Sequence, residues 1–388
     1  MSFVKKSLLW KSFLGKPLFW SVFLFCQVAV AQQSHDKEWR LVRMESQKSF
    51  PQTVPAGNYS GITHLHDDIY AVVSDKSDSA LYFRFKIQID ERSGELLRVE
   101  NLGFTEYVDG RVKNRQHWQA HSCGFDHEAI AKVSDSTLVV ASEGKYWLKE
   151  YPIIEEDTTH VNTDFESMLP PSNLWKHEWS SSLFYPNYVF ESLAYDSVRH
   201  VLWTISESTL RRDGQPSTPQ NGLANKLRLM GFFKRDSLNF ECDSLVSYAY
   251  QMDKPSTTKK AEIYVMGVSE LCSLPDGQLL VLEREAFIPK IKVGAFCRCK
   301  LYLVDPLHEP TFPLSEPFAA DTPFIKKRLL TEWKTSLSVF DRSFANYEGM
   351  CLGPVLQDGS QVLILLSDSQ DQYKGVLKDY FKTIILSH

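Results

Sequence analysis

Five short motifs in this 388-residue chain place an oxygen-bearing side chain at the same position of a recurring pattern. They read NYSGIT from residue 58, DHEAIA from 126, VFESLA from 189, GVSELC from 267 and NYEGMC from 346. The third position of each motif, here called the anchor, holds Ser60, Glu128, Glu191, Ser269 or Glu348. Three glutamates and two serines gathered in one place would offer the hard oxygen ligands that Ca²⁺ prefers. Zinc is disfavoured because no anchor is a histidine or a cysteine.

Carboxylates that are brought together repel one another, and their pKa values rise unless a cation compensates. We therefore predict that the five anchors bind Ca²⁺. The residues leave one alternative open, in which the anchors only hydrogen-bond to nearby backbone and water fills the space between them.

A second set of acids follows the anchors, at the ends of apolar runs such as IYAVVSD and LVVASE. Its members are Asp75, Glu143, Glu207, Glu283 and Asp368. An acid after a strand often caps a turn, but its recurrence in all five units favours a shared role. Metal-holding carboxylates beside arginines that grip oxyanions would form a phosphoester site. The predicted catalytic residues are Asp75, Glu143, Glu207, Arg84 and Arg284.

The elements that must position these side chains repeat with the motifs. Successive anchors are 63 to 79 residues apart, and each is followed by strand-like apolar runs with few helical patterns. Units of about four short antiparallel strands are typical of β-propeller blades, whose first strands line a central channel. The anchors would therefore face one another in that channel. We predict an all-β fold with a single five-bladed β-propeller, and the spacing leaves a sixth, divergent blade open.

The fifth unit ends one strand short, and the segment WRLVRMESQ from residue 39 could close the ring. A β-sandwich is the alternative all-β fold, but it would not explain five recurrences of one motif. Two proline-containing segments, residues 152–188 and 305–323, are predicted to be long loops. Long loops on rigid scaffolds often carry function.

The first 31 residues have the features of a secretory signal peptide. Four lysines precede the apolar run PLFWSVFLFCQVAVA, whose last three residues, Ala29, Val30 and Ala31, supply a cleavage site. An uncleaved anchor helix is the alternative, but the run is short for a membrane span. We expect residues 32–388 to form one exported domain without an integral membrane segment, located in the periplasm, outside the cell or at its surface.

The composition bounds the class of partner. The chain is 43% hydrophobic, which suits a large packed core, and its net charge of -5 gives no basic surplus for a nucleic acid. We expect a monomer. Six cysteines follow the signal peptide, and an oxidising compartment would allow disulfides whose pairing the sequence does not choose. Cys272 and Cys351 lie three positions after their anchors, where the other units have Thr or Ala, which indicates a packing role.

The same motifs resemble those of a known family. The ordered series GNYSGITHL, DHEAIA, NYVFESLAYD, GVSELCSLPDG and NYEGMCL, within residues 56 to 386, is similar to the exported bacterial family described as esterase-like activity of phytase. The anchor order also resembles the central calcium ring of five-bladed calcium-activated nucleotidases. The chain departs from its family after Glu128 and Glu191, where Ala129 and Ser192 stand in place of the usual glycine.

The family resemblance implies phosphoester hydrolysis on a propeller. We therefore expect an exported, Ca²⁺-binding hydrolase that acts on a small-molecule phosphoester. The anchors would hold the metal, a nearby water molecule would attack, and Arg84 or Arg284 would steady the phosphate. The alternative is a non-catalytic periplasmic or surface binding module in which the calcium is structural.

Overall fold

The computed structural model describes residues 38–116, 124–144, 147–161, 163, 183–233, 244–370 and 377–388. The chain divides into Met1–Lys37 and Glu38–His388, and the second unit is the one described below. The predicted signal peptide, residues 1–31, lies outside the described residues, as do Cys123 and Cys242. Over the ranges given above, no helix is long and apolar enough to cross a membrane.

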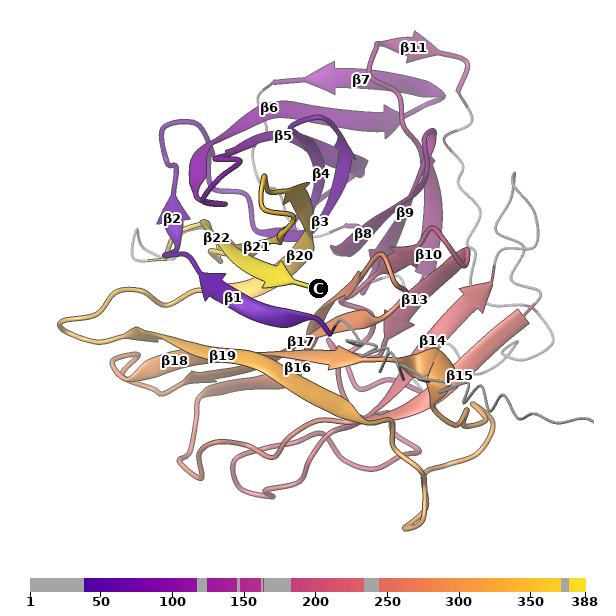
Figure 1. Cartoon of the computed structure of the whole chain (residues 1–388), viewed down its shortest axis with the longest axis vertical. Helices are drawn as coiled ribbons and strands as arrows, with labels where there is room; N and C mark the ends of the chain where they lie inside the picture. The colour runs from indigo at the N-terminus through magenta and orange to yellow at the C-terminus, as the bar shows by residue number, and fades with distance from the viewer. Residues whose placement is uncertain are drawn as a thin grey trace, which may run out of the picture. The chain divides into compact units, whose positions relative to one another are not determined.

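Five antiparallel sheets, here called blades 1 to 5, make up the Glu38–His388 unit (Figure 1). Blade 1 contains β3 (Tyr59–His66), β4 (Ile69–Ser74), β5 (Ala80–Ile89), β6 (Leu96–Val108), β7 (Arg111–Arg115) and β11 (Thr158–Thr159). Blade 2 contains β8 (His127–Ser134), β9 (Thr137–Ser142) and β10 (Trp147–Pro152). Blade 3 contains β12 (Ala194–Asp196), β13 (Val201–Ile205), β14 (Lys226–Phe233) and β15 (Ser244–Gln251).

The last two blades follow the same order. Blade 4 contains β16 (Ile263–Ser273), β17 (Leu279–Ile288), β18 (Ala295–Val304) and β19 (Lys327–Leu337). Blade 5 contains β20 (Asn346–Val355), β21 (Gln361–Asp368), β22 (Tyr380–Ser387) and β1 (Arg40–Met44), and β2 (Lys48–Ser49) also pairs with β22. The described residues include no α-helix, only the 3₁₀ turn η1 (Pro306–His308).

The middle strands are almost entirely buried because both faces of each blade are covered. All eight residues of β21, QVLILLSD, are buried. Successive side chains of a strand point to opposite faces. Val362 and Ile364 therefore join a core cluster with blade 1, whereas Leu363 and Leu365 join one with blade 4. The blades consequently stack face to face around a ring.

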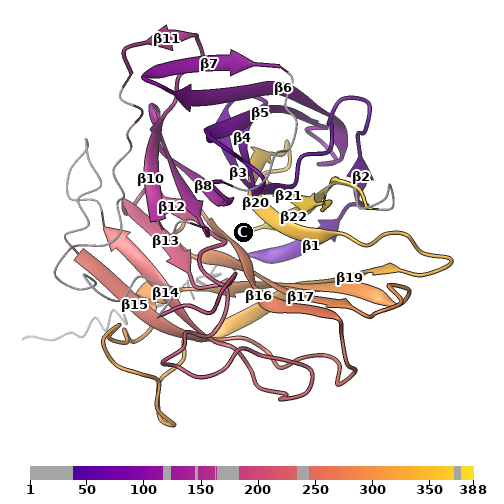
Figure 2. The same ribbon diagram turned by 180° about the vertical axis from the view of Figure 1, so that it is seen from behind.

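The first strands of the five blades close that ring. β3 contacts β8, β8 contacts β12, β12 contacts β16, β16 contacts β20, and β20 contacts β3. Figures 1 and 2 show the five sheets around this common axis from its two ends. The prediction of an all-β, five-bladed propeller is confirmed, and neither the sandwich nor a sixth blade describes this ring.

The N-terminal strand completes the last blade, as predicted. β1 pairs with β22, with Arg40 opposite Ser387 and Leu41 opposite Leu386. Blade 5 therefore combines strands from both ends of the described chain.

The 305–323 loop packs as a cover on blade 3. The Phe312 N–H donates to the Ser247 carbonyl oxygen at 2.7 Å. Arg228 of β14 is fully buried beneath the loop, where it lies over the ring of Phe318 and pairs with Asp213 at 2.7 Å. These contacts give this loop a structural role. Most of the 152–188 loop lies outside the described residues.

Four cysteines lie in the described parts of the chain, and all are free and buried: Cys272, Cys297, Cys299 and Cys351. Cys272 and Cys351 belong to core clusters, which confirms their packing role.

The residue after an anchor is small where neighbouring inner strands approach closely. A Cβ on Gly349 would lie 2.3 Å from the carbonyl oxygen of Ser60, and one on Gly61 would lie 2.7 Å from the Cα of Ala129. Both obstacles are backbone atoms of the next blade, which cannot rotate away as a side chain can. Glycine at these positions lets the ring close.

We expect Gly349→Ala to lower the free energy of unfolding by roughly 1–3 kcal/mol, the usual penalty for overpacking a closed core. The matched control is Gly353→Ala on the same strand, whose Cβ would meet only side-chain atoms, at 3.1–3.2 Å. Urea unfolding of both variants measures the difference. An equal loss of stability in both variants would contradict the conclusion that close backbone contact at Gly349 requires glycine there.

Candidate metal centre

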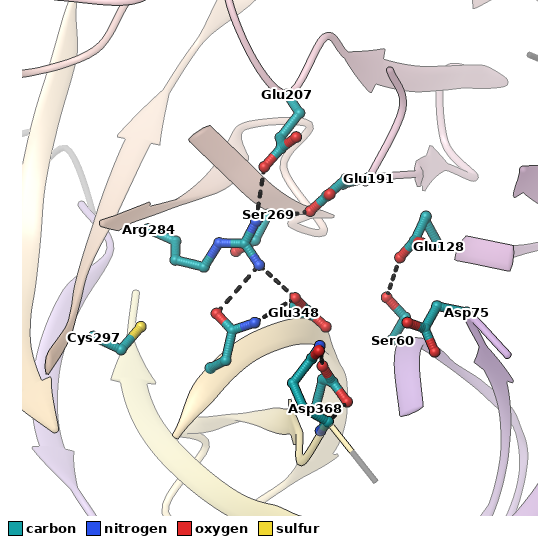
Figure 3. A network of polar contacts seen from close by, with 12 residues as sticks. Ser60, Asp75, Glu128, Glu191, Glu207, Ser269, Arg284, Cys297, Glu348 and Asp368 are labelled. Carbon is teal, nitrogen blue, oxygen red and sulfur yellow. Dashed lines mark hydrogen bonds and ion pairs between the residues drawn. The ribbon is translucent and has the colours of Figure 1, made fainter. Parts of the chain in front are cut away.

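Each anchor lies at a one-residue bulge of its inner strand. In four blades the register between the inner strand and the second strand shifts by one residue around the anchor. The shift falls between Tyr59 and Ile62 in blade 1, His127 and Ala129 in blade 2, Val268 and Glu270 in blade 4, and Tyr347 and Gly349 in blade 5. Blade 3 has the same offset between the Phe190–Ser206 bridge and the Ala194–Trp203 pair. A bulge leaves one residue outside the ladder and re-aims its side chain. The five anchors therefore occupy equivalent bulges, and Figure 3 shows them arranged around one space.

A second ring of side chains comes from the second strand of each blade or from a residue just after it. Each member pairs with the residue that lies two positions before the anchor of that blade. The N–H groups of Asp75, Glu143 and Glu207 donate to the carbonyl oxygens of Asn58, Asp126 and Val189 at 3.2, 3.0 and 3.0 Å. In blade 5 Asp368 pairs with Asn346, and in blade 4 Arg284 pairs with Gly267. The second ring is thus Asp75, Glu143, Glu207, Arg284 and Asp368.

The prediction that Glu283 belongs to this ring is wrong by one residue. Because side chains alternate along a strand, Glu283 and Arg284 point to opposite faces of blade 4. Glu283 Oε1 accepts hydrogen bonds from the Tyr250 hydroxyl at 2.7 Å and from Lys327 Nζ at 2.6 Å. Glu283 therefore supports the packing of blade 4 on blade 3. The ring position that was predicted for Glu283 is occupied by Arg284, which brings a positive charge in place of a negative one.

Arg284 binds three carboxylates of the two rings (Figure 3). Its Nη2 donates to Glu207 Oε1 at 2.8 Å and to Glu191 Oε2 at 3.1 Å. Its Nη1 donates to Glu348 Oε1 at 2.5 Å and to Asn346 Oδ1 at 3.2 Å. The arginine side chain is only 3% exposed. This ion-pair network joins blades 3, 4 and 5 near the axis.

Three carboxylates of blades 1 and 2 form a separate cluster. One oxygen each of Asp75, Asp126 and Glu128 lies within 4.8 Å of the other two. Ser60 Oγ donates to Glu128 Oε2 at 2.7 Å, and Lys76 Nζ pairs with Asp75 Oδ2 at 2.5 Å. Ca²⁺ binds oxygen ligands at about 2.3–2.6 Å, so two ligands of one ion are at most about 5 Å apart. This donor set therefore fits Ca²⁺.

A further group of acids also has metal-like spacing. Oxygens of Glu143, Glu191 and Glu207 lie within 4.8 Å of one another. Arg284 already binds two of these residues, and Glu143 Oε1 accepts the Val189 N–H at 3.1 Å. In this group the guanidinium supplies the positive charge that a metal ion would otherwise bring.

Burial raises the pKa of the ring acids. It raises the pKa of Glu143 to about 7 and the pKa values of Glu207 and Glu348 to about 8. The pKa values of Glu128 and Glu191 lie well above the usual range, first because of burial and then because of neighbouring carboxylates. Such groups hold protons at neutral pH unless a cation compensates their charge.

Two residues of the centre were missed by the sequence prediction. Asp126 joins Asp75 and Glu128, and its φ of +52° is a left-handed conformation that Asp and Asn tolerate. Its equivalent Asn58 has a φ of +46°. The available signal was the Asn or Asp that opens three of the five motifs.

The second missed residue is Glu270, which follows the anchor Ser269. It is fully buried, and its Oε1 accepts the N–H groups of Leu193 at 3.1 Å and Leu271 at 3.0 Å. Its carboxylate thus ties the inner strands of blades 3 and 4. The signal was a glutamate where the other four units have Gly, Ala or Ser.

The structure brings most, but not all, of the predicted site residues together. Ser269 lies at its bulge, but its Oγ donates to the Leu282 carbonyl oxygen of its own blade at 3.5 Å. Arg84 lies on β5, opposite Ala71 of β4, so that β4 separates it from the inner strand β3. The residues gathered in the two clusters are Ser60, Asp75, Glu128, Glu143, Glu191, Glu207, Arg284 and Glu348.

Comparison with known proteins gives one family match. A phytase-like family, described as esterase-like activity of phytase, matches residues 54–370. No curated protein matches the chain. Among solved structures, a streptogramin B lyase is 12% identical with a TM-score of 0.32, covering 87% of this chain and 97% of its own. Virginiamycin B lyase from Staphylococcus aureus with quinupristin is 8% identical with a TM-score of 0.31, covering 90% and 100%.

Proposed function

Because the chain belongs to the phytase-like family described as esterase-like activity of phytase, we propose that it is an exported, Ca²⁺-binding hydrolase of small-molecule phosphoesters. The observation that carries this proposal is the cluster of Asp75, Asp126 and Glu128, whose oxygens lie within 4.8 Å of one another. These residues, with Ser60 beside them, would hold the ion. Bound there, Ca²⁺ would supply positive charge that stabilises a phosphoryl group as it is attacked.

Glu143 is the best placed general base among the ring acids. Its pKa of about 7 lies near neutral pH. At that pH a large fraction of the group is ionised, and the ionised carboxylate is still basic enough to accept a proton from water. It is 9% exposed, and its Oε1 is oriented by the Val189 N–H at 3.1 Å. We assign Glu143 the role of accepting the proton of an attacking water molecule.

Arg284 acts in this proposal by positioning carboxylates. Its hydrogen bonds fix the orientation of Glu191, Glu207 and Glu348, and the first two of these lie close to Glu143. Arg284 would reach a phosphate only after releasing one of these partners. Arg84, on the far side of β4, takes no part in the reaction as proposed.

The substrate and location follow from the same reasoning. A chain with a net charge of -5 and an acidic centre suits a small substrate whose charge a metal ion offsets, and it does not suit a nucleic acid. We propose removal of residues 1–31, export of residues 32–388 to the periplasm or the cell exterior, and a monomeric state.

The test is hydrolysis of p-nitrophenyl phosphate, nucleotides and inositol hexakisphosphate, with calcium and with a chelator. We expect turnover that the chelator abolishes. Glu128→Gln should lower both calcium affinity and turnover at fixed calcium by about 10- to 100-fold, because it removes one charged ligand. The control is Glu332→Gln, a side chain 49% exposed on β19. Absence of chelator-sensitive turnover on every substrate would overturn the enzyme proposal.

A non-catalytic binding module with structural calcium is the second candidate. The observation that favours it is Arg284, which already neutralises part of the ring and ties three blades together. If calcium raises the melting temperature and Glu128→Gln abolishes that rise, while no phosphoester is hydrolysed, this candidate replaces the first.

A further inference from the structure

Two neighbouring loops at one end of blade 4 expose large apolar side chains. Residues 289–294 connect β17 to β18, and residues 338–345 connect β19 to β20. Ile291 is 83% exposed and Val293 53% in the first loop, and Val339 is 73% exposed and Phe340 99% in the second. Contiguous exposed apolar residues on a folded protein usually mark an interaction surface.

Hydrogen-bonded turns hold these side chains outward. In the first loop the Lys292 N–H donates to the Pro289 carbonyl oxygen at 2.9 Å. In the second, Ser338 Oγ accepts the N–H groups of Phe340 at 3.2 Å and Asp341 at 2.9 Å, and the Ser338 N–H donates to the Asp341 carbonyl oxygen at 2.6 Å. The exposure is therefore built into ordered turns.

The two loops lie side by side. The Gly294 N–H, at the end of the first loop, donates to the carbonyl oxygen of Leu337, which directly precedes the second. Figure 1 shows the connection from β19 to β20 projecting beyond the sheets. Next to the loops, an apolar pocket of about 250 Å³ is lined by Ile263, Ile288, Leu337 and Phe344, among others. The exposed tips thus border a larger apolar surface.

Cations flank the apolar tips. The first loop carries Lys290 and Lys292, of which Lys292 pairs with Glu262 at 3.1 Å, and the second carries Arg342 beside Asp341. The two loops thus keep a positive charge, although the net charge of the whole chain is -5. Apolar tips flanked by Lys290 and Arg342 match the two layers of an anionic membrane surface, which are acyl chains beneath negatively charged headgroups.

We propose that residues 289–294 and 338–345 dock the protein onto the surface of an anionic lipid bilayer. Ile291 and Phe340 enter the interface, and Lys290 and Arg342 contact the headgroups. A second copy of the chain is the less favoured occupant, because face-to-face loops would bring Lys290 and Arg342 against their own counterparts. The proposal is independent of the hydrolase activity, since it rests on a surface outside the acidic rings.

The test is co-flotation of the protein with vesicles of phosphatidylcholine, alone or with phosphatidylglycerol. We expect stronger binding to the anionic vesicles, weakened by added salt. The Ile291→Ser/Phe340→Ser variant should lose at least about tenfold in partitioning, since burial of one such side chain accounts for a factor of that order. Lys290→Gln/Arg342→Gln should reduce binding to anionic vesicles and leave binding to neutral ones unchanged.

The matched control is Leu97→Ser/Val198→Ser, which removes two apolar side chains that are 58% and 66% exposed elsewhere on the surface. The N-terminal apolar run is the same in every variant, so differences between them report on the loops. Equal flotation of the wild type and the Ile291→Ser/Phe340→Ser variant would overturn the proposal. So would light scattering that shows a wild-type dimer and a variant monomer with unchanged vesicle binding.

Discussion

Replacing Arg284 with glutamine should lower the free energy of unfolding of the metal-free protein by about 3–5 kcal/mol, the usual effect of removing one partner of a buried ion pair. Glu191, Glu207 and Glu348 would then lose the guanidinium that binds them at 2.5–3.1 Å. Urea unfolding at pH 9, where pKa values of about 8 leave Glu207 and Glu348 ionised, gives the value. Arg284→Lys should lose less, because it keeps the charge but not the planar fork that reaches several carboxylates.

Arg298→Gln is the matched control for this prediction. Arg298 lies on the neighbouring strand β18, is 32% exposed, and pairs only distantly with Glu332 Oε2, at 3.9 Å. Its loss should change stability by less than about 1 kcal/mol. We also expect calcium to restore part of the stability of Arg284→Gln, since the vacated acids can accept a cation. A loss below 1 kcal/mol for Arg284→Gln at pH 9 would contradict a stabilising role for this ion-pair network.

The metal-free protein should become less stable as the pH rises from 6.5 to 8.5, by about 2–4 kcal/mol in total. The pKa values of Glu207 and Glu348 are about 8 in the folded protein, against a usual value of 4.5. In this window the unfolded chain has already lost these protons while the folded chain still holds them, so raising the pH favours unfolding. Urea unfolding of metal-stripped protein across this range measures the slope.

The lower limit of the window is set by His127. Burial lowers the pKa of His127 to about 3, so this group makes stability rise with pH up to about 6.5 and opposes the acids there. Above 6.5 it contributes nothing. Saturating calcium should flatten the slope, because the ion favours the ionised acids, and Glu348→Gln should remove part of it. Stability that rises with pH between 6.5 and 8.5 without metal would contradict the pKa assignment.

The fold could be predicted because its signal is repeated. Ser60, Glu128, Glu191, Ser269 and Glu348 recur with apolar runs at nearly constant spacing, and a ring of equivalent blades requires such a recurrence. The strand that closes blade 5 was also predictable, since the fifth unit lacked one strand and residues 40–44 had the required pattern. The export signal and the monomeric state stay predictions.

The register of the second ring could not be predicted in blade 4. The repeat indicates only that an acidic residue lies near the end of the second strand, and in blade 4 Glu283 fits that pattern. The residue at the equivalent structural position is the next one, Arg284. A one-residue difference reverses the face of the sheet that a side chain occupies. Only the pairing of Gly267 with Arg284 shows which residue points inward.

The chemistry of the centre was also only partly accessible. An arginine that binds three acids from two other blades involves residues 64 to 93 positions apart, and no local pattern specifies such contacts. Asp126 was hidden for a different reason, because its role depends on a left-handed backbone that turns its carboxylate toward Glu128. Sequence therefore located the acids, and the structure divided them into a group next to Arg284 and a group whose spacing could hold a metal ion.

The pairing of β1 with β22 also has a consequence for how the molecule reaches its native state. Arg40 and Ser387 are partners although almost the entire described chain separates them. Contacts of such high sequence separation form slowly, because most of the chain must be ordered before they stabilise it. During synthesis β1 emerges well before its partner β22, so the ring stays open until residues 380–387 have been made. A chain truncated before residue 380 should therefore remain protease-sensitive at blade 5, because β1 then lacks its partner strand.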